Sequence, residues 1–277
     1  MTEWWQHIPA SIDPIVFAVG SFSLRWYPVF FILGWVAATS FLSRRIRRDG
    51  HVGLDADALL DSALVAFAGA VVGGRLGYAL LYDPSLFSHP LSIVSPFDDS
   101  GAWKGIWGMS FHGALFGVAV ALVLFARIRK IDFWVLSDAL ALATPMALFF
   151  GRIGNFFNHE LVGRVTERPF GMYFSDEAIL RHPSQLYEAF FEGVILFICL
   201  FFIGKRRLRA GYMSIGFLFL YGCMRFFLEF LREPDKGVDL IFGWMTVGQT
   251  LSLVLVAISV AILGFLSKRN DGILKRK

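Results

Sequence analysis

Seven apolar segments, each close to the length at which a helix crosses a lipid bilayer, dominate this sequence. A hydrocarbon core about 30 Å thick requires about 20 apolar residues in a helix. The segments occupy roughly residues 27–44, 57–82, 107–127, 132–150, 187–204, 211–231 and 242–267. Charged residues make up only 17% of the chain, against about 25% in a soluble domain. The sequence therefore predicts an all-α integral membrane protein with about seven transmembrane helices, in a single transmembrane domain over residues 1–277.

Basic residues form short clusters after the first, third, fifth and seventh of these segments. The clusters occupy residues 44–48, 127–130, 205–209 and 268–277. In a chain of seven spans they all face one side, which the positive-inside rule makes cytoplasmic. We expect the N-terminus outside and the C-terminus inside. Membrane topology thus accounts for the formal charge of +4, and we predict no nucleic-acid partner.

The connections on the opposite side are longer and mixed in charge. They cover about residues 83–106, 151–186 and 232–241 and hold most of the prolines. Functional residues are often carried by such loops. We therefore expect the site to face outward, with residues 151–186 as an outward-facing loop segment between spans four and five. The sequence contains no convincing internal repeat, which argues against the interpretation as an inverted-repeat transporter.

The second and third segments each carry an ionisable residue among small residues. Such a residue costs about 2.5–3.5 kcal/mol at the membrane centre on insertion scales. The motif Gly73–Tyr78 sets three glycines around Arg75, which indicates either close helix packing with a snorkelling arginine or a functional site. His112, in Phe111–Ala114, is either a structural hydrogen-bonding group or a proton acceptor suited to neutral pH.

A third polar motif, Gly151–Glu160, follows the fourth segment. Arg152 and Asn155 are three residues apart and share a face if the helix continues that far. A guanidinium beside an amide, with glycines that expose backbone N–H groups, suits a phosphate or carboxylate head group. The alternative is a helix end followed by a solvated turn.

The sixth segment ends in a charged stripe. Arg225, Glu229 and Arg232 have i, i+4, i+7 spacing and lie on one helix face. They indicate either a structural ion network or one wall of a polar cavity. A second polar face, in the fifth segment, consists of Gln185, Glu188 and Glu192.

Several motifs of known chemistry are absent from the sequence. It contains no Walker loop, no HExxH, no GxSxG and no carboxylate cluster suited to magnesium. Metal-driven phosphoryl transfer is therefore disfavoured, and we predict neither a metal nor a cofactor. Cys199 and Cys223 lie inside apolar segments, where free thiols behave as small hydrophobic residues.

Four motifs together resemble the bacterial phosphatidylglycerol–prolipoprotein diacylglyceryl transferases. They are GRIGNFFNHELVGR, RHPSQLYE, FHGA and YGCMRFFLEFLREPD. The resemblance runs from Arg25 to Asp235, most of the chain, and the first two motifs are highly specific. Two departures are visible. Ala114 occupies the second glycine position of the usual HGG motif, and His159 stands where a glycine usually precedes Glu160.

The resemblance implies a reaction, its partners and a set of positions. The family transfers a diacylglyceryl group from phosphatidylglycerol to the lipobox cysteine of a lipoprotein precursor, forming a thioether and releasing glycerol phosphate. The expected partners are phosphatidylglycerol, the signal peptides of lipoprotein precursors and the bilayer. The expected location is the bacterial inner membrane, with the active site on the periplasmic side. The functional positions map to Tyr27, His112, Arg152, Asn155, Glu160, Gly163, Arg225, Glu229 and Arg232.

We hypothesise an alkyl transfer in which the cysteine sulfur attacks the glyceryl C3 carbon. Arg225 and Arg152 are expected to hold the phosphodiester and stabilise the leaving phosphate. A thiol with a pKa of about 8.5 is mostly protonated at neutral pH. The reaction therefore needs a base, and His112 is the candidate. Supporting roles are expected for residues that orient the lipid or the peptide (Tyr27, Asn155), fix Arg225 (Glu229) or order the outer loop (Glu160). The alternatives are a lipid transporter or scramblase, and a membrane protein that binds precursors without chemistry.

Overall fold

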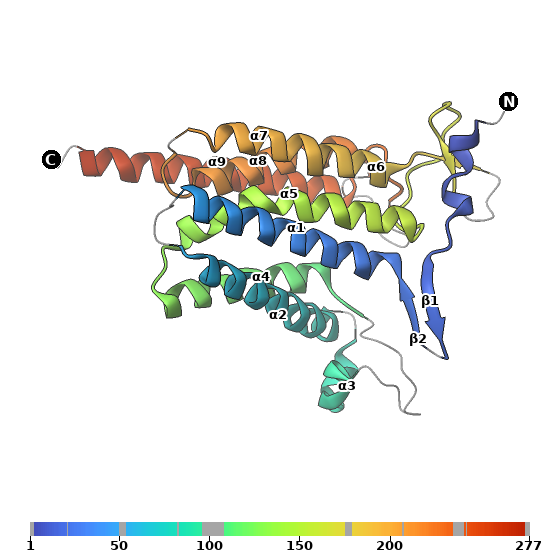
Figure 1. Cartoon of the computed structure of the whole chain (residues 1–277), viewed down its shortest axis with the longest axis horizontal. Helices are drawn as coiled ribbons and strands as arrows, with labels where there is room; N and C mark the ends of the chain where they lie inside the picture. Colours follow the sequence, from blue (N-terminus) through green and yellow to red (C-terminus); the bar gives the residue numbers. More distant parts are fainter. Residues whose placement is uncertain are drawn as a thin grey trace. The chain divides into compact units, whose positions relative to one another are not determined.

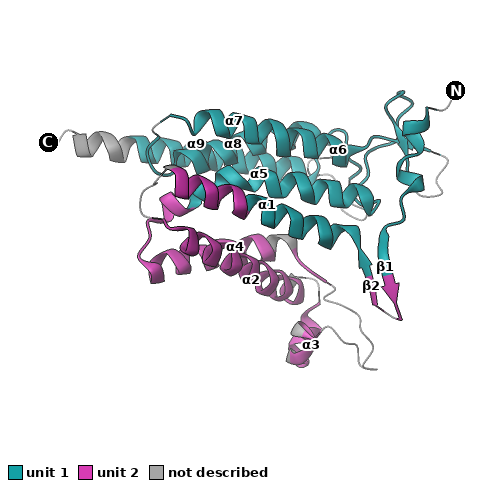
Figure 2. Ribbon diagram, viewed as in Figure 1, with its two compact units in different colours: residues 1–17, 24–38, 137–277 teal, residues 18–23, 39–136 magenta. Residues whose placement is uncertain are grey.

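Helices make up most of the described chain in the computed structural model (Figure 1). The structure describes residues 3–20, 22–49, 54–81, 83–95, 108–174, 179–206, 208–234, 241 and 243–274. The chain divides into two compact units (Figure 2). Unit 1 comprises Met1–Phe17, Leu24–Ala38 and Ser137–Lys277, and unit 2 comprises Ala18–Ser23 and Thr39–Leu136. The single domain over residues 1–277 stays a prediction.

Several helices have the length and composition of membrane spans. Within the described residues, five qualify: Trp26–Arg48, Ala56–Leu80, Phe133–Phe157, Ser184–Ile203 and Val247–Ser267. A shorter apolar helix covers Tyr212–Leu228. The prediction of an all-α integral membrane protein is confirmed, and the count of seven spans stays a prediction.

Unit 1 contains the first part of α1 and most of the remaining spans. Its helices include α1 (Trp26–Asp49, up to Ala38), α5 (Phe133–Phe157, from Ser137), α8 (Tyr212–Leu228) and α9 (Val247–Leu274). Helix α8 packs along α9 (Figure 1). Glycines permit close contact, because a Cβ at Gly222 would lie 2.9 Å from the Val256 side chain and one at Gly154 would lie 3.1 Å from Cα of Tyr27.

The predicted fifth span is one continuous helix made of three segments. It consists of α6 (Ser184–Glu188), a π-helical segment η4 (Ala189–Ile195) and α7 (Leu196–Ile203). Glu188 ends α6 and Glu192 lies within η4, and both side chains are fully buried. Because π-helical turns occur mostly as short insertions, frequently at functional sites, η4 marks this span as irregular at the level of its two carboxylates.

The connection between α5 and α6 forms a small head on unit 1. Strand β3 (Met172–Tyr173) pairs antiparallel with β4 (Leu180–Arg181). Phe156, Met172 and Phe174 form a buried cluster beneath them. The N-terminal turns η1 (Trp4–His7) and η2 (Pro9–Ser11) pack against β3, so the head combines the start of unit 1 with the connection between α5 and α6. Outside the head, β1 (Ile15–Val19) and β2 (Phe22–Arg25) form a two-stranded sheet.

Unit 2 is centred on the contact between α2 (Ala56–Leu81) and α4 (Phe111–Arg129). A Cβ at Gly73 would lie 2.7 Å from Cα of Gly117, and one at Gly77 would lie 2.7 Å from Cα of Gly113. Only residues without side chains allow two backbones to approach so closely. The short helices η3 (Pro84–Ser88) and α3 (Pro90–Val94) follow α2.

Two of the helix ends that differ from the sequence prediction bear on the site. Helix α5 continues to Phe157, beyond the predicted end of span four at residue 150, so Arg152 and Asn155 lie on the helix. Helix α8 ends at Leu228, before the predicted residue 231, with Glu229 as its C-cap. Beyond it, the backbone of Arg232 pairs with Gly163 of the head. This pairing draws the chain out of the helix, so Arg232 does not continue the face of Arg225 and Glu229.

Candidate active site

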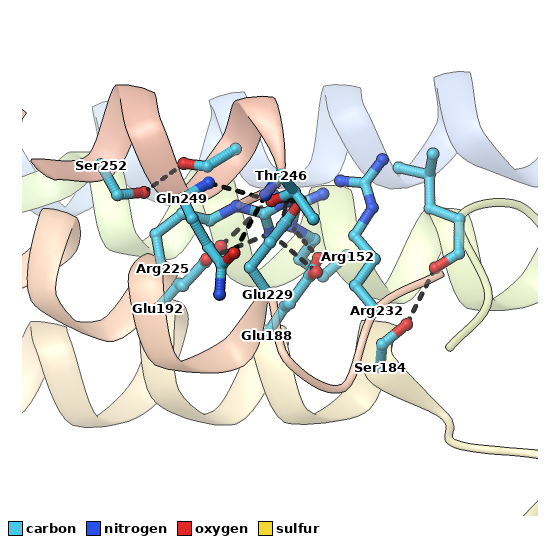
Figure 3. Close-up of polar contacts among 12 residues, drawn as sticks. Arg152, Ser184, Glu188, Glu192, Arg225, Glu229, Arg232, Thr246, Gln249 and Ser252 are labelled. Carbon is cyan, nitrogen blue, oxygen red and sulfur yellow. Dashed lines mark hydrogen bonds and ion pairs between the residues drawn. The ribbon is translucent and has the colours of Figure 1, made fainter. Parts of the chain in front are cut away.

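Arg152 of α5 forms ion pairs with both buried carboxylates of the fifth span. Its Nε lies 2.9 Å from Oε2 of Glu188, and its Nη2 lies 3.3 Å from Oε2 of Glu192 (Figure 3). Both carboxylates have at most 1% of their side chains exposed. Buried charges persist only when they are paired, so α5 and the fifth span are joined by a pair of charged contacts.

Arg225 of α8 reaches the same two carboxylates from another helix. Its Nη1 lies 2.7 Å from Oε1 of Glu188 and 3.5 Å from Oε1 of Glu192, and its Nη2 lies 2.7 Å from Oε2 of Glu229 (Figure 3). Glu188 and Glu192 are therefore each shared between two guanidinium groups. We call these five residues (Arg152, Glu188, Glu192, Arg225 and Glu229) the Arg–Glu cluster.

The start of α9 supports the last carboxylate of the Arg–Glu cluster. Thr246 Oγ1 donates a hydrogen bond to Oε1 of Glu229 at 3.1 Å. Thr246 Oγ1 also accepts a hydrogen bond from the backbone N–H of Gln249 at 3.1 Å, and Gln249 Oε1 accepts one from the backbone N–H of Thr246 at 3.0 Å. This reciprocal arrangement is a capping box. It sets Glu229 at the positive end of a helix dipole, which favours a carboxylate.

The Arg–Glu cluster carries one excess negative charge when all its groups are ionised, because two guanidinium groups face three carboxylates. The N-terminus of α9 offsets part of that charge. The ion pairs of the cluster use Nε and Nη2 of Arg152 and Nη1 and Nη2 of Arg225, so Arg152 Nη1 and Arg225 Nε take no part in them. Their N–H groups remain available to an anionic ligand, while the carboxylates hold the two guanidinium groups in place.

A second network begins one helical turn further along α5. Glu160 Oε2 accepts from Asn155 Nδ2 at 3.2 Å, and Glu160 Oε1 accepts from Asn158 Nδ2 at 3.1 Å. Asn158 Oδ1 accepts from the backbone N–H of Tyr27 at 3.2 Å. Gln185 Nε2 donates to the backbone oxygen of Glu160 at 2.6 Å. The predicted site residues Tyr27, Asn155 and Glu160 therefore belong to one hydrogen-bonded network in unit 1.

The turn that carries Glu160 has an unusual backbone. His159 and Leu161 both have φ of 57°, in the left-handed region. Glycine adopts this region without steric cost, which explains physically why a glycine suits the position that His159 occupies. The helix α6 holds the turn in place, since Ser184 Oγ donates to the backbone oxygen of Leu161 at 2.9 Å.

Gly163 and Arg232 meet through their backbones, in an isolated antiparallel bridge. The N–H of Gly163 donates to the oxygen of His182 at 2.9 Å, and a Cβ at Gly163 would lie 2.7 Å from the oxygen of Leu231. A side chain at Gly163 would thus separate three segments of the head. Partial burial lowers the pKa of the nearby His182 below its usual value. A substrate contact of Gly163 or Arg232 stays a prediction.

His112 is the second residue of α4, in unit 2. Its side chain lies outside the described residues. The structure therefore gathers Arg152, Arg225 and Glu229 in the Arg–Glu cluster, while the predicted base belongs to the other unit. Among the described residues, no group of three or more His, Cys, Asp or Glu could hold a metal ion.

Sequence reasoning did not assign several residues to the site. Glu188 and Glu192 were identified as a polar face but not as partners of the arginines. Their signal was available, because two glutamates four residues apart within an apolar span need cations nearby. Thr246 and Gln249 also carried a signal, the T-x-x-Q pattern that opens a helix. Asn158 carried none beyond its place in the motif.

Helices of membrane-spanning length, buried ion pairs between helices and a polar head together define a multi-pass membrane protein with a buried cluster of charged side chains. A sequence model of the prolipoprotein diacylglyceryl transferase family matches residues 14–265. The chain belongs to this family.

Relatives named phosphatidylglycerol–prolipoprotein diacylglyceryl transferase align over nearly the whole chain. The relative from Chlorobaculum tepidum is 41% identical over 276 residues, covering 98% of this chain and 95% of the relative. The relative from Geobacter sulfurreducens is 42% identical over 263 residues, covering 94% and 98%. The relative from Wolinella succinogenes is 38% identical over 271 residues, covering 97% and 98%.

Proposed function

We propose that this protein transfers the diacylglyceryl group of phosphatidylglycerol to the thiol of the lipobox cysteine in lipoprotein precursors, the first step of their maturation. Family membership supports the reaction. The observation that carries the proposal is the pair of buried guanidinium groups, Arg152 and Arg225, which Glu188 and Glu192 hold together among membrane helices. Such a pair suits the anionic head group of a lipid.

In the proposed step, the cysteine sulfur attacks the glyceryl C3 carbon of the lipid. A C–S bond forms and the bond between C3 and the phosphate oxygen breaks, so glycerol phosphate leaves with the bonding electron pair. The thiol proton passes to a base, and the leaving phosphate gains one negative charge. N–H groups directed at that oxygen stabilise the charge as it develops.

Arg152 Nη1 and Arg225 Nε are the groups that we assign to the phosphate. Both belong to guanidinium groups fixed by carboxylates, so little reorganisation accompanies binding. Tyr27 and Asn155 orient the lipid or the peptide, and Glu160 orders the turn that carries it. Gly163 and Arg232 lie close to the bound lipid head group. His112 accepts the thiol proton, since a neutral imidazole suits this task near neutral pH.

We further propose an orientation in the bacterial inner membrane, with the N-terminus and the site on the periplasmic side. The basic clusters at residues 44–48 and 127–130 support it through the positive-inside rule. A cysteine at Leu91, which is 81% exposed, should react with an impermeant reagent from outside. A reporter after Lys277, beyond the described residues, should read cytoplasmic. Labelling of position 91 only from the cytoplasmic side contradicts the orientation.

One assay tests the function. Purified full-length protein is mixed with labelled phosphatidylglycerol and a lipobox peptide, with a Cys→Ser peptide as the matched control. We expect a thioether product on the cysteine peptide alone. Lipid movement between leaflets without a covalent product would indicate a scramblase or transporter, and peptide binding without product would indicate a precursor-binding protein. Either result overturns the proposal.

A further inference from the structure

A single guanidinium in unit 2 binds three backbone carbonyls. Arg75, in α2, is 8% exposed. Its Nε donates to the oxygen of Ile93 at 2.5 Å, its Nη2 to the oxygen of Ser92 at 2.9 Å, and its Nη1 to the oxygen of Gly108 at 2.9 Å. Hydrogen bonds from a charged donor are stronger than neutral ones, so Arg75 joins two separate segments of the connection between α2 and α4.

These two segments are the described ends of one stretch of chain. Ser92 and Ile93 belong to the last turn of α3, where carbonyls lack partners within the helix. Gly108 is the first described residue before α4. Arg75 therefore binds described residues that precede and follow this stretch, and it does so from a helix that packs against α4 along its glycines.

Other residues of the Gly73–Tyr78 motif make contacts with the same segment. The backbone N–H of Ser110 donates to the oxygen of Gly74 at 2.9 Å. Ser110 Oγ accepts from the N–H of Gly113 at 3.3 Å and so caps α4. Gly108 has φ of +73°, and a Cβ there would lie 2.6 Å from the ring of Tyr78. The motif thus holds the chain from Gly108 to the first turn of α4.

We propose that Arg75 is a positioning residue for His112. It fixes the start of α4 through Gly108, and with it the backbone position of His112, two residues after the capping Ser110. This inference rests on the proposed function, in which His112 accepts the thiol proton. Displacement of a reacting group by about 1 Å can cost about 10²-fold in rate, so the anchoring of this helix start bears directly on turnover.

The first test is the Arg75→Gln variant of the full-length protein in vesicles of phosphatidylglycerol with a lipobox peptide. We expect kcat to fall by about 10²-fold, with KM for the lipid changed by less than about two-fold because the Arg–Glu cluster is untouched. The matched control is Arg129→Gln. Arg129 lies at the other end of α4 and pairs with Asp61 of α2 at the surface, and this variant should keep wild-type kcat.

The pH profile separates positioning from folding. With the base misplaced, solvent must ionise the thiol, so the rate of Arg75→Gln should rise more steeply than that of wild type between about pH 7 and about pH 9. Loss of folded protein would scale the rate equally at every pH. An unchanged shape of the profile overturns the inference.

A double-mutant cycle completes the test. If Arg75 acts through His112, Arg75→Gln should lower kcat by less than about three-fold in the His112→Gln background. Multiplicative effects, or a normal kcat in Arg75→Gln, overturn the inference while leaving the proposed function standing. A wild-type protein that forms no thioether at all contradicts the proposed function instead.

Discussion

The Nη2 atom of Arg225 lies 2.7 Å from Oε2 of Glu229, one helical turn further along the chain. The other oxygen of that carboxylate accepts a hydrogen bond from Thr246 at 3.1 Å, and Thr246 caps α9. One carboxylate therefore joins the end of α8 to the start of α9. The orientation of the Arg225 guanidinium therefore depends in part on Thr246, through Glu229.

The Thr246→Val variant should lower turnover although it changes no charge. Valine keeps the shape but removes both the hydrogen bond to Glu229 and the cap of α9, which together are worth about 2–4 kcal/mol. We expect kcat/KM for phosphatidylglycerol to fall by about ten-fold or more. The control is Thr250→Val, one turn along α9, whose hydroxyl donates to the backbone oxygen of Thr246 at 3.2 Å. Equal rates in the two variants would show that Glu229 needs no support from α9.

Arg225→Lys should be nearly as damaging as Arg225→Ala. Lysine keeps the positive charge but replaces a planar fork with a point charge, whereas Arg225 contacts Glu188 and Glu229 through two different nitrogens. The check is the rate of thioether formation for both variants, with Arg129→Lys as the surface control. If lysine restores near-normal turnover, Arg225 supplies charge alone and the fixed geometry is irrelevant.

Glu188→Gln should destabilise the protein more than Glu192→Gln. Glu188 makes the two shorter contacts, 2.9 Å to Arg152 and 2.7 Å to Arg225, whereas those of Glu192 are 3.3 and 3.5 Å. Breaking a buried pair by removing one partner costs about 3–5 kcal/mol. Melting temperatures in detergent give the ranking, with wild type as reference. The opposite order would mean that contact distance does not govern the strength of these pairs.

His112→Gln should abolish most transfer near neutral pH while phosphatidylglycerol still binds, because the arginines hold the lipid. Loss of a general base lowers the rate by about 10²–10⁴-fold. Raising the pH toward about 8.5 should recover part of the rate, since the thiol then ionises in solvent. Rates measured between about pH 6.5 and about pH 9.5 check this. Near-wild-type turnover at neutral pH removes His112 from the chemistry, and a variant inactive at every pH that has lost lipid binding indicates a structural histidine.

His159→Gly should be more stable than His159→Ala. His159 has φ of 57°, a conformation that costs a residue with a Cβ about 1–2 kcal/mol and costs glycine nothing sterically. Glycine's greater freedom in the unfolded chain offsets about 0.5–1 kcal/mol of this gain. Both variants lose the ring contact with Phe174, so their difference in melting temperature reports the backbone alone. A more stable alanine variant would contradict the assigned strain.

The membrane class was predictable because long apolar runs and basic loops follow directly from the physics of the bilayer. The contact between Arg225 and Glu229 was predictable too, since four residues form one helical turn. Asn155 and Glu160 lie within one short motif, so their proximity needed only a helix end between them. Local spacing thus accounts for much of what each span contributes by itself.

The links between spans were not predictable from spacing. Glu188 pairs with Arg152 of one helix and Arg225 of another, and no periodicity within a span says which neighbour faces it. The prediction that Arg232 shares a helix face with Arg225 and Glu229 was wrong for a related reason. Arg232 pairs with Gly163, and this contact lies outside the helix. The hydrogen bonds from Arg75 to three backbone carbonyls likewise depend on tertiary structure, because these carbonyls lie in the connection between α2 and α4.

The full burial of Glu188 and Glu192 has a consequence for the conditions under which the protein works. Mobile ions weaken interactions between exposed charges beyond a Debye length of about 8 Å at physiological ionic strength, but they screen buried pairs far less. Salt should therefore affect the encounter with a charged precursor much more than it affects the setting of the two guanidinium groups. Buried in the protein, the cluster keeps its electrostatic character whatever the ionic strength of the surrounding solution.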